Sequence, residues 1–82
     1  MDRPLLAAIA RFPDRGHAIE KLARRDEEFL LLCADLAEAE AALAGWERSD
    51  TPVREARCAE YRDLVRDLAV EVEIALNRHS QP

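Results

Sequence analysis

The chain has 82 residues, of which 49% are hydrophobic and 35% are charged, and it carries a formal net charge of −5 at pH 7. A chain of this length forms one small domain with a modest core, which oligomerisation commonly stabilises, and its composition is not that of a disordered protein. The acidic balance argues against nucleic-acid and anionic-membrane partners, and the scarcity of glycine, proline and β-branched residues favours an all-α fold.

The charged residues are spread evenly when the chain is divided at residue 46. Residues 1–46 carry six basic and nine acidic side chains, and residues 47–82 carry six and eight, so this division shows no basic tail. Leu5–Ala10 is too short for the hydrophobic region of a signal peptide, and no apolar run approaches the length that spans a membrane. The sequence therefore predicts a cytoplasmic protein.

The first predicted element is a short helix over residues 3–12. Pro4 suits the first turn of a helix. The helix should end at Phe12, because the residue before a proline is driven out of the helical region. Its apolar side chains lie roughly on one face and are Leu5, Leu6, Ile9 and Phe12. The sequence leaves open whether this helix docks on the rest of the chain.

The second predicted element is a helix over residues 14–47, with Asp14 as its N-cap. The segment Arg24–Glu28 places two cations before three anions, an order that suits the end of one helix followed by the start of another. The sequence is equally compatible with a break near residues 25–26, where Asp26 caps a new helix, and with one continuous helix.

An apolar seam with heptad spacing runs along the C-terminal two thirds of this helix. Its members are Leu22, Phe29, Leu32, Leu36, Ala39, Leu43 and Trp46. The segment Phe29–Ala34 is apolar on every side for more than a turn, which is typical of a helix that is buried on more than one side. We therefore expect this helix to pack against a second helix of the chain and against something further, such as another copy.

Residues 48–51 are predicted to form a turn, and residues 52–77 a last helix. Thr51 is a good N-cap and Pro52 suits the first helical position. A short connection makes the two long helices antiparallel neighbours. The last helix carries a matching seam of Cys58, Tyr61, Val65, Leu68, Val72 and Ala75. The predicted fold is therefore all-α, an antiparallel two-helix hairpin with a short N-terminal helix that dimerises into a four-helix bundle.

Charge also suggests a register for the hairpin. Residues 26–47 hold seven acidic side chains and no Lys or Arg. Folding the chain about residues 49–50 brings these acids near arginines of the last helix. The expected neighbours are Asp35 with Arg62 and Arg66, Glu38 with Arg62, and Glu40 with Arg57 and Arg62. Each exposed pair contributes roughly 0–1 kcal/mol, so the pairs would select the register more than they would stabilise it.

No combination of side chains predicts a catalytic or metal site. Cys33 and Cys58 are offset by about 12 Å along the helices in this register, which is too far for a disulfide, so both are expected to be small buried hydrophobes. His17 and His79 are distant, and no His or Cys pair has the spacing of zinc ligands. No phosphate-binding loop or nucleophile elbow is present. We expect no enzymatic activity, no metal and no cofactor.

Over residues 12–76 the chain resembles the YdcH-like family of small uncharacterised bacterial helical-hairpin proteins. The matching pieces are Phe12-Pro13 ahead of a helix, Asp26-x-x-Phe29-x-x-Leu32, an acidic and apolar helix, a polar turn with Pro52, and a second helix rich in Arg and Leu. The chain departs from the family near Leu36, where an aromatic residue or His is usual, and in its preference for Arg and Ala over Lys. The resemblance implies an α-hairpin fold and implies no activity.

The sequence thus predicts a non-enzymatic helical protein that acts through protein–protein interaction, chiefly by self-association as a homodimer. The alternative is an adaptor or regulatory module that offers the same apolar faces to a different protein. Trp46 either closes the end of the bundle or anchors a partner, since Trp is enriched at interfaces. The expected interface consists of Phe29, Leu30, Leu31, Ala34, Ala37, Trp46, Val70 and Ile74. We expect neither a nucleic acid nor a membrane as a partner.

Overall fold

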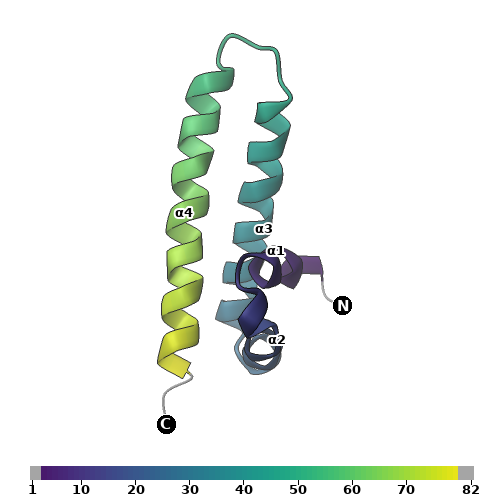
Figure 1. Cartoon of the computed structure of the whole chain (residues 1–82), viewed down its shortest axis with the longest axis vertical. Coiled ribbons are helices and arrows are strands. Elements are labelled where there is room, and N and C mark those ends of the chain that lie inside the picture. The colour runs from purple at the N-terminus through teal and green to yellow at the C-terminus, as the bar shows by residue number, and fades with distance from the viewer. Residues whose placement is uncertain (1–2, 80–82) are drawn as a thin grey trace.

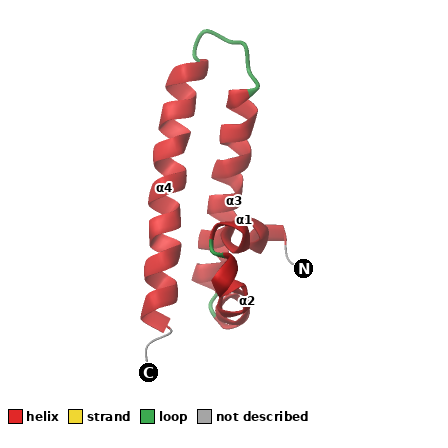
Figure 2. Cartoon of the chain, in the orientation of Figure 1, coloured by secondary structure: helices red, strands yellow, loops and turns green. Residues whose placement is uncertain are grey.

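The computed structural model describes residues 3–79. The regular secondary structure of this part of the chain consists of helices without a strand, so the predicted all-α class is confirmed for it (Figure 2). The elements in chain order are α1 (Arg3–Arg11), the short 3-10 helix η1 (Pro13–Arg15), α2 (Gly16–Arg25), α3 (Glu27–Glu47) and α4 (Arg54–His79).

The two long helices α3 and α4 lie side by side and run in opposite directions (Figure 1). The N-terminal elements gather around the half of this pair that is distant from the connecting loop. There α1 packs mainly on α3, and α2 contacts both long helices. The N-terminal helix, whose docking the sequence left open, is therefore docked.

The predicted helix over residues 14–47 is broken at Asp26, so the continuous alternative is not observed. Asp26 has an extended backbone (φ −137°, ψ 101°), and its side chain accepts a hydrogen bond of 3.1 Å from the backbone N–H of Phe29. This is an N-cap, which satisfies one of the unpaired amides at a helix start. Asp14 is not the N-cap that we expected, because it lies inside η1 and α2 begins only at Gly16.

The loop between the long helices is longer than predicted. It covers residues 48–53 rather than 48–51, and α4 begins at Arg54, so Pro52 lies in the loop and not in the helix. Within the loop, the hydroxyl of Ser49 accepts a hydrogen bond of 3.2 Å from the N–H of Thr51. Short polar side chains that bond to nearby backbone groups favour a turn over a helix in this way.

The core lies where the four helices meet. Its fully or nearly fully buried members are Leu5 and Ala8 of α1, Ile19, Leu22 and Ala23 of α2, Phe29, Cys33, Leu36 and Ala39 of α3, and Val65, Ala69, Val72 and Leu76 of α4. On α4 the buried residues differ in part from those of the predicted seam. Ala69 and Leu76 are buried, whereas Leu68 and Ala75 are only half-buried. The buried stripe of α4 is thus turned away from the side that Leu68 and Ala75 occupy.

Candidate protein-interaction groove

One side of the α3–α4 pair is covered and the other is open. On the covered side, Arg11 of α1 forms an ion pair of 3.1 Å with Glu40 of α3. Leu31 lies nine residues before Glu40, about two and a half helical turns, and so points to the opposite side of α3. Leu31 is 57% exposed. The part of the chain that the structure describes therefore leaves this side of α3 without a covering helix.

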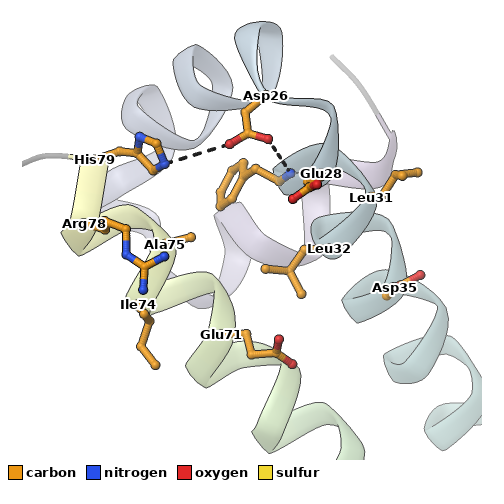
Figure 3. Close-up of a pocket in the computed structure, with 11 residues that line it drawn as sticks. Asp26, Glu28, Leu31, Leu32, Asp35, Glu71, Ile74, Ala75, Arg78 and His79 are labelled. Carbon is orange, nitrogen blue, oxygen red and sulfur yellow. Dashed lines mark hydrogen bonds and ion pairs between the residues drawn. The ribbon is translucent and has the colours of Figure 1, made fainter.

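Three adjoining hollows run along the open side. The first has a volume of about 690 Å³ and lies between the start of α3 and the end of α4, where Figure 3 shows Leu32 from one helix and Glu71 from the other lining it. The second, of about 460 Å³, shares Asp35 with the first, and the third, of about 260 Å³, shares Leu64 and Tyr61 with the second. We call this continuous surface the α3–α4 groove.

The groove has an apolar floor and charged rims. The floor is formed by Leu32, Ala39, Ala42, Leu68 and Ala75, and Trp46 lies at the end near the loop. The acidic side chains that line the groove are Asp26, Glu28, Asp35, Glu38, Glu60 and Glu71, and the arginines are Arg57 and Arg78. Along 21 residues of α3 the groove could extend for roughly 30 Å. An apolar floor between polar rims is the form of surface that receives an amphipathic helix.

The eight predicted interface residues do not form one face. Phe29 belongs to the core, at 3% exposed. Leu30 packs against the core, and Ala37, one turn before Glu40, lies toward α1 with it. Ala34 is half-buried, and Val70 is exposed but lines none of the three hollows. The groove brings together only three exposed or half-exposed members of the set, which are Leu31, Ile74 and Trp46.

The apolar face of α3 is covered in part within the chain. The wide apolar face of α3 was expected to need a second copy, but α1 of the same chain covers much of it. Sequence reasoning named Ile74 of α4 but missed Leu64 of the same helix, which is 44% exposed and lines the groove. The spacing of Leu64 and Leu68, four residues apart on a helix, was the available signal.

The predicted ion pairs between α3 and α4 are wrong. Glu40 pairs with Arg11 instead of Arg57 or Arg62. The arginines of α4 pair elsewhere: Arg57 with Glu60 at 2.7 Å, Arg62 with Glu47 at 3.7 Å, and Arg66 with Asp63 and Asp67 at 3.3 and 3.6 Å. Glu40 is engaged by α1, and Arg57 and Arg66 are engaged by acids of their own helix. Within residues 3–79, no hydrogen bond or ion pair engages the side chains of Glu28, Asp35, Glu38 and Glu71.

The charges are also less evenly spread than a division at residue 46 suggests. The break at Asp26 is the structural boundary, and dividing the sequence there gives a different result. Residues 1–25 hold six basic and three acidic side chains, a net charge of +3, whereas residues 26–82 hold six and fourteen, a net charge of −8. The covering helices α1 and α2 are therefore basic, and the pair α3 and α4, which forms the groove, is acidic.

Other chemistry-bearing side chains do not converge on a site. Among the described residues, no three His, Cys, Asp or Glu side chains are grouped so that they could hold a metal ion. Both cysteines are unbridged and buried, as expected, and burial raises the pKa of the Cys33 thiol from its ordinary 9.0 to about 11. His79 lies 3.9 Å from Asp26 at one end of the groove (Figure 3). None of the helices in residues 3–79 has the length and apolar character needed to cross a bilayer.

Comparisons of this chain with protein-family models, with curated proteins and with solved structures found no match. The resemblance to the YdcH-like family therefore stays a prediction.

Proposed function

We propose that this chain is a non-enzymatic protein-interaction module whose binding surface for an α-helix is the α3–α4 groove. The observation that carries the proposal is the row of large apolar side chains left in water along one side of the molecule. Leu31, Leu64 and Ile74 are 57%, 44% and 50% exposed, and all three line the groove. Exposed apolar surface with polar edges is characteristic of interaction sites.

Self-association is the second candidate, and the extent of the groove along both long helices favours it. Two copies that placed their grooves together would form an antiparallel four-helix bundle, with α3 and α4 of each copy as an α-hairpin. The covering helices would then lie outside the bundle. This arrangement would bury Leu31 and Ile74, which are on different helices at the same end of the groove (Figure 3).

The test is a pair of matched substitutions on α4. Ile74 and Val70 are 50% and 47% exposed, but only Ile74 lines the groove. Ile74→Glu should abolish binding of a helical partner, or dimer formation if the partner is a second copy, because it places a charge on the apolar surface. Val70→Glu adds the same charge outside the groove and should leave binding unchanged.

Light scattering coupled to size exclusion, over a tenfold range of concentration, gives the mass of the unmodified chain and of both variants. Circular dichroism verifies that each variant is still helical. A dimer that is lost in Ile74→Glu and kept in Val70→Glu would support self-association through the groove. A dimer that is lost equally in both variants, or kept in both, would exclude the groove as the surface of self-association.

A further inference from the structure

We infer that the occupant of the α3–α4 groove is a cationic amphipathic helix of a different protein. The inference rests on the proposed function, and it adds the charge and the identity class of the partner. It is carried by the contrast between the apolar floor of the groove and four carboxylates on its rims that form no ion pair within residues 3–79.

The groove carries a net negative charge. Six carboxylates line it against two guanidinium groups, a net charge of −4 with His79 neutral. One of these guanidinium groups is already engaged, because Arg57 donates a hydrogen bond of 2.7 Å to Glu60, which raises the pKa of Arg57. Four of the carboxylates have no partner within residues 3–79, as described above.

Those four carboxylates lie on both rims of the groove. Glu28, Asp35 and Glu38 are seven and three residues apart on α3, so they follow one side of that helix. Glu71 lies on α4, across the floor from them, in the same hollow as Glu28 and Asp35 (Figure 3). A bound helix with an apolar stripe would fill the floor, and Lys or Arg on both flanks of that stripe would meet carboxylates on both rims.

A second copy of this chain is a poor occupant of the groove. In a dimer with groove against groove, each copy would bring its net −4 to the same interface, and juxtaposed like charges oppose association. The chain's own cations are poorly placed to relieve this. Arg62 and Arg66 already pair with acids of the same chain, and Lys21 and Arg25 of α2 line a separate hollow beyond His79.

The helix α2 is also a poor ligand for another copy's groove. Its exposed face consists of His17, Lys21, Arg24 and Arg25, which is cationic but has no apolar stripe. Its apolar side chains Ile19 and Leu22 are buried in the core of its own chain. The charge of α2 would suit the rims, but nothing on its exposed face would fill the floor.

The test uses three synthetic helical peptides of about 18 residues, roughly 27 Å long, that share one leucine stripe. Their flanking positions are all Lys, all Gln or all Glu. Binding of each labelled peptide to the full chain is measured by fluorescence anisotropy in 0.1 M and 1 M NaCl. We expect the Lys peptide to bind at least tenfold more tightly than the Gln peptide in 0.1 M salt, and the Glu peptide to show no binding. The advantage of the Lys peptide should disappear in 1 M salt, where the Debye length falls from about 10 Å to about 3 Å.

Two triple variants separate the rims from the overall charge. The first, Glu28→Gln with Asp35→Asn and Glu71→Gln, removes three rim carboxylates and should reduce binding of the Lys peptide to the level of the Gln peptide. The second, Glu27→Gln with Glu55→Gln and Glu73→Gln, makes the same change in net charge at exposed residues that line none of the hollows, and should leave the preference at least tenfold.

The outcomes distinguish this inference from the proposed function. Equal binding of the Lys and Gln peptides, with sensitivity to Ile74→Glu, would overturn the cationic partner and keep the groove as a binding surface. A wild-type dimer that Ile74→Glu dissociates would also overturn it, because a second copy would then fill the groove. Failure of all three peptides to bind, or binding that Ile74→Glu and Val70→Glu affect equally, would overturn both.

Discussion

Cys33 shows what burial does to a single side chain in this core. It lies on α3 with no exposed surface, and its sulfur has lost the water that would stabilise a thiolate. The raised pKa of about 11 follows from that loss. A thiol that stays protonated is a poor nucleophile and a poor metal ligand, so the side chain behaves as an apolar residue of the core.

The raised pKa makes a prediction about stability at high pH. The folded chain keeps the Cys33 thiol neutral to higher pH than the unfolded chain does. The contribution of the buried thiol to the free energy of unfolding is therefore complete below pH 9. This contribution should decline as pH rises from 9 toward 11, by about 2 kcal/mol in the free energy of unfolding. Chemical denaturation of the wild type and of Cys33→Ala across this range measures it.

The comparison with Cys33→Ala isolates this group from the other groups that titrate at high pH. The two free energies of unfolding should differ by a constant amount between pH 6 and 8, where the thiol is neutral in both states. Their difference should then shrink above pH 9, since only the wild type carries the thiol. A difference that stays constant to pH 11 would show that burial does not perturb this thiol.

At the scale of the elements, the break between α2 and α3 gives a physical role to the Asp-x-x-Phe pattern. Asp26 leaves the helical region and its carboxylate accepts the N–H of Phe29, while the Phe29 ring enters the core. Arg24 and Arg25 at the end of α2 and Glu27 and Glu28 at the start of α3 each complement the dipole of their own helix. The residue types around the break therefore all favour it.

We predict that Asp26→Ala lowers the free energy of unfolding by about 1 kcal/mol, because α3 loses its N-cap. Asp26→Asn should cost less, since the amide oxygen can still accept the N–H of Phe29. Thermal or chemical unfolding of both variants measures the difference. Equal losses in the two variants would assign the effect to the negative charge, including its approach to His79 at 3.9 Å, instead of to the cap.

The helices themselves could be predicted from sequence, because apolar periodicity, Pro13 and the polar segment after Glu47 mark them clearly. The ion pairs between α3 and α4 could not. Glu40 pairs with Arg11 of α1, and Arg57 and Arg66 pair with acids of their own helix. A pattern of charges admits several sets of partners, and exposed pairs of similar small energy do not determine which set forms.

The groove depends on a packing choice that the sequence of α3 does not reveal by itself. Both sides of α3 offer apolar residues, with Leu30 on one and Leu31 on the other. Docking of α1 buries the first side and leaves the second exposed, so three of the eight predicted interface residues, Phe29, Leu30 and Ala37, lie in the core, against it or toward α1. Leu31, Trp46 and Ile74 all line the groove, and their role as an interface stays a prediction.

At the scale of the whole molecule, positive and negative charges are separated along the chain. The covering helices belong to the basic N-terminal segment, and the groove belongs to the acidic remainder of the chain. Such a separation orients an approaching charged partner before contact and disfavours like-charged ones. In this account, the apolar floor supplies the affinity of the module and the carboxylates on the rims select the partner.

The central claim is that the α3–α4 groove is the binding surface, and mapping of backbone amide chemical shifts by nuclear magnetic resonance tests it most directly. On addition of the Lys peptide to the full chain, we predict the largest shifts at groove-lining residues of α3 and α4, such as Leu31, Leu64 and Ile74. The amides of α1 and α2 should change little, because neither helix lines the three hollows of the groove. Shifts concentrated on α1 and α2, with the groove unchanged, would contradict the account.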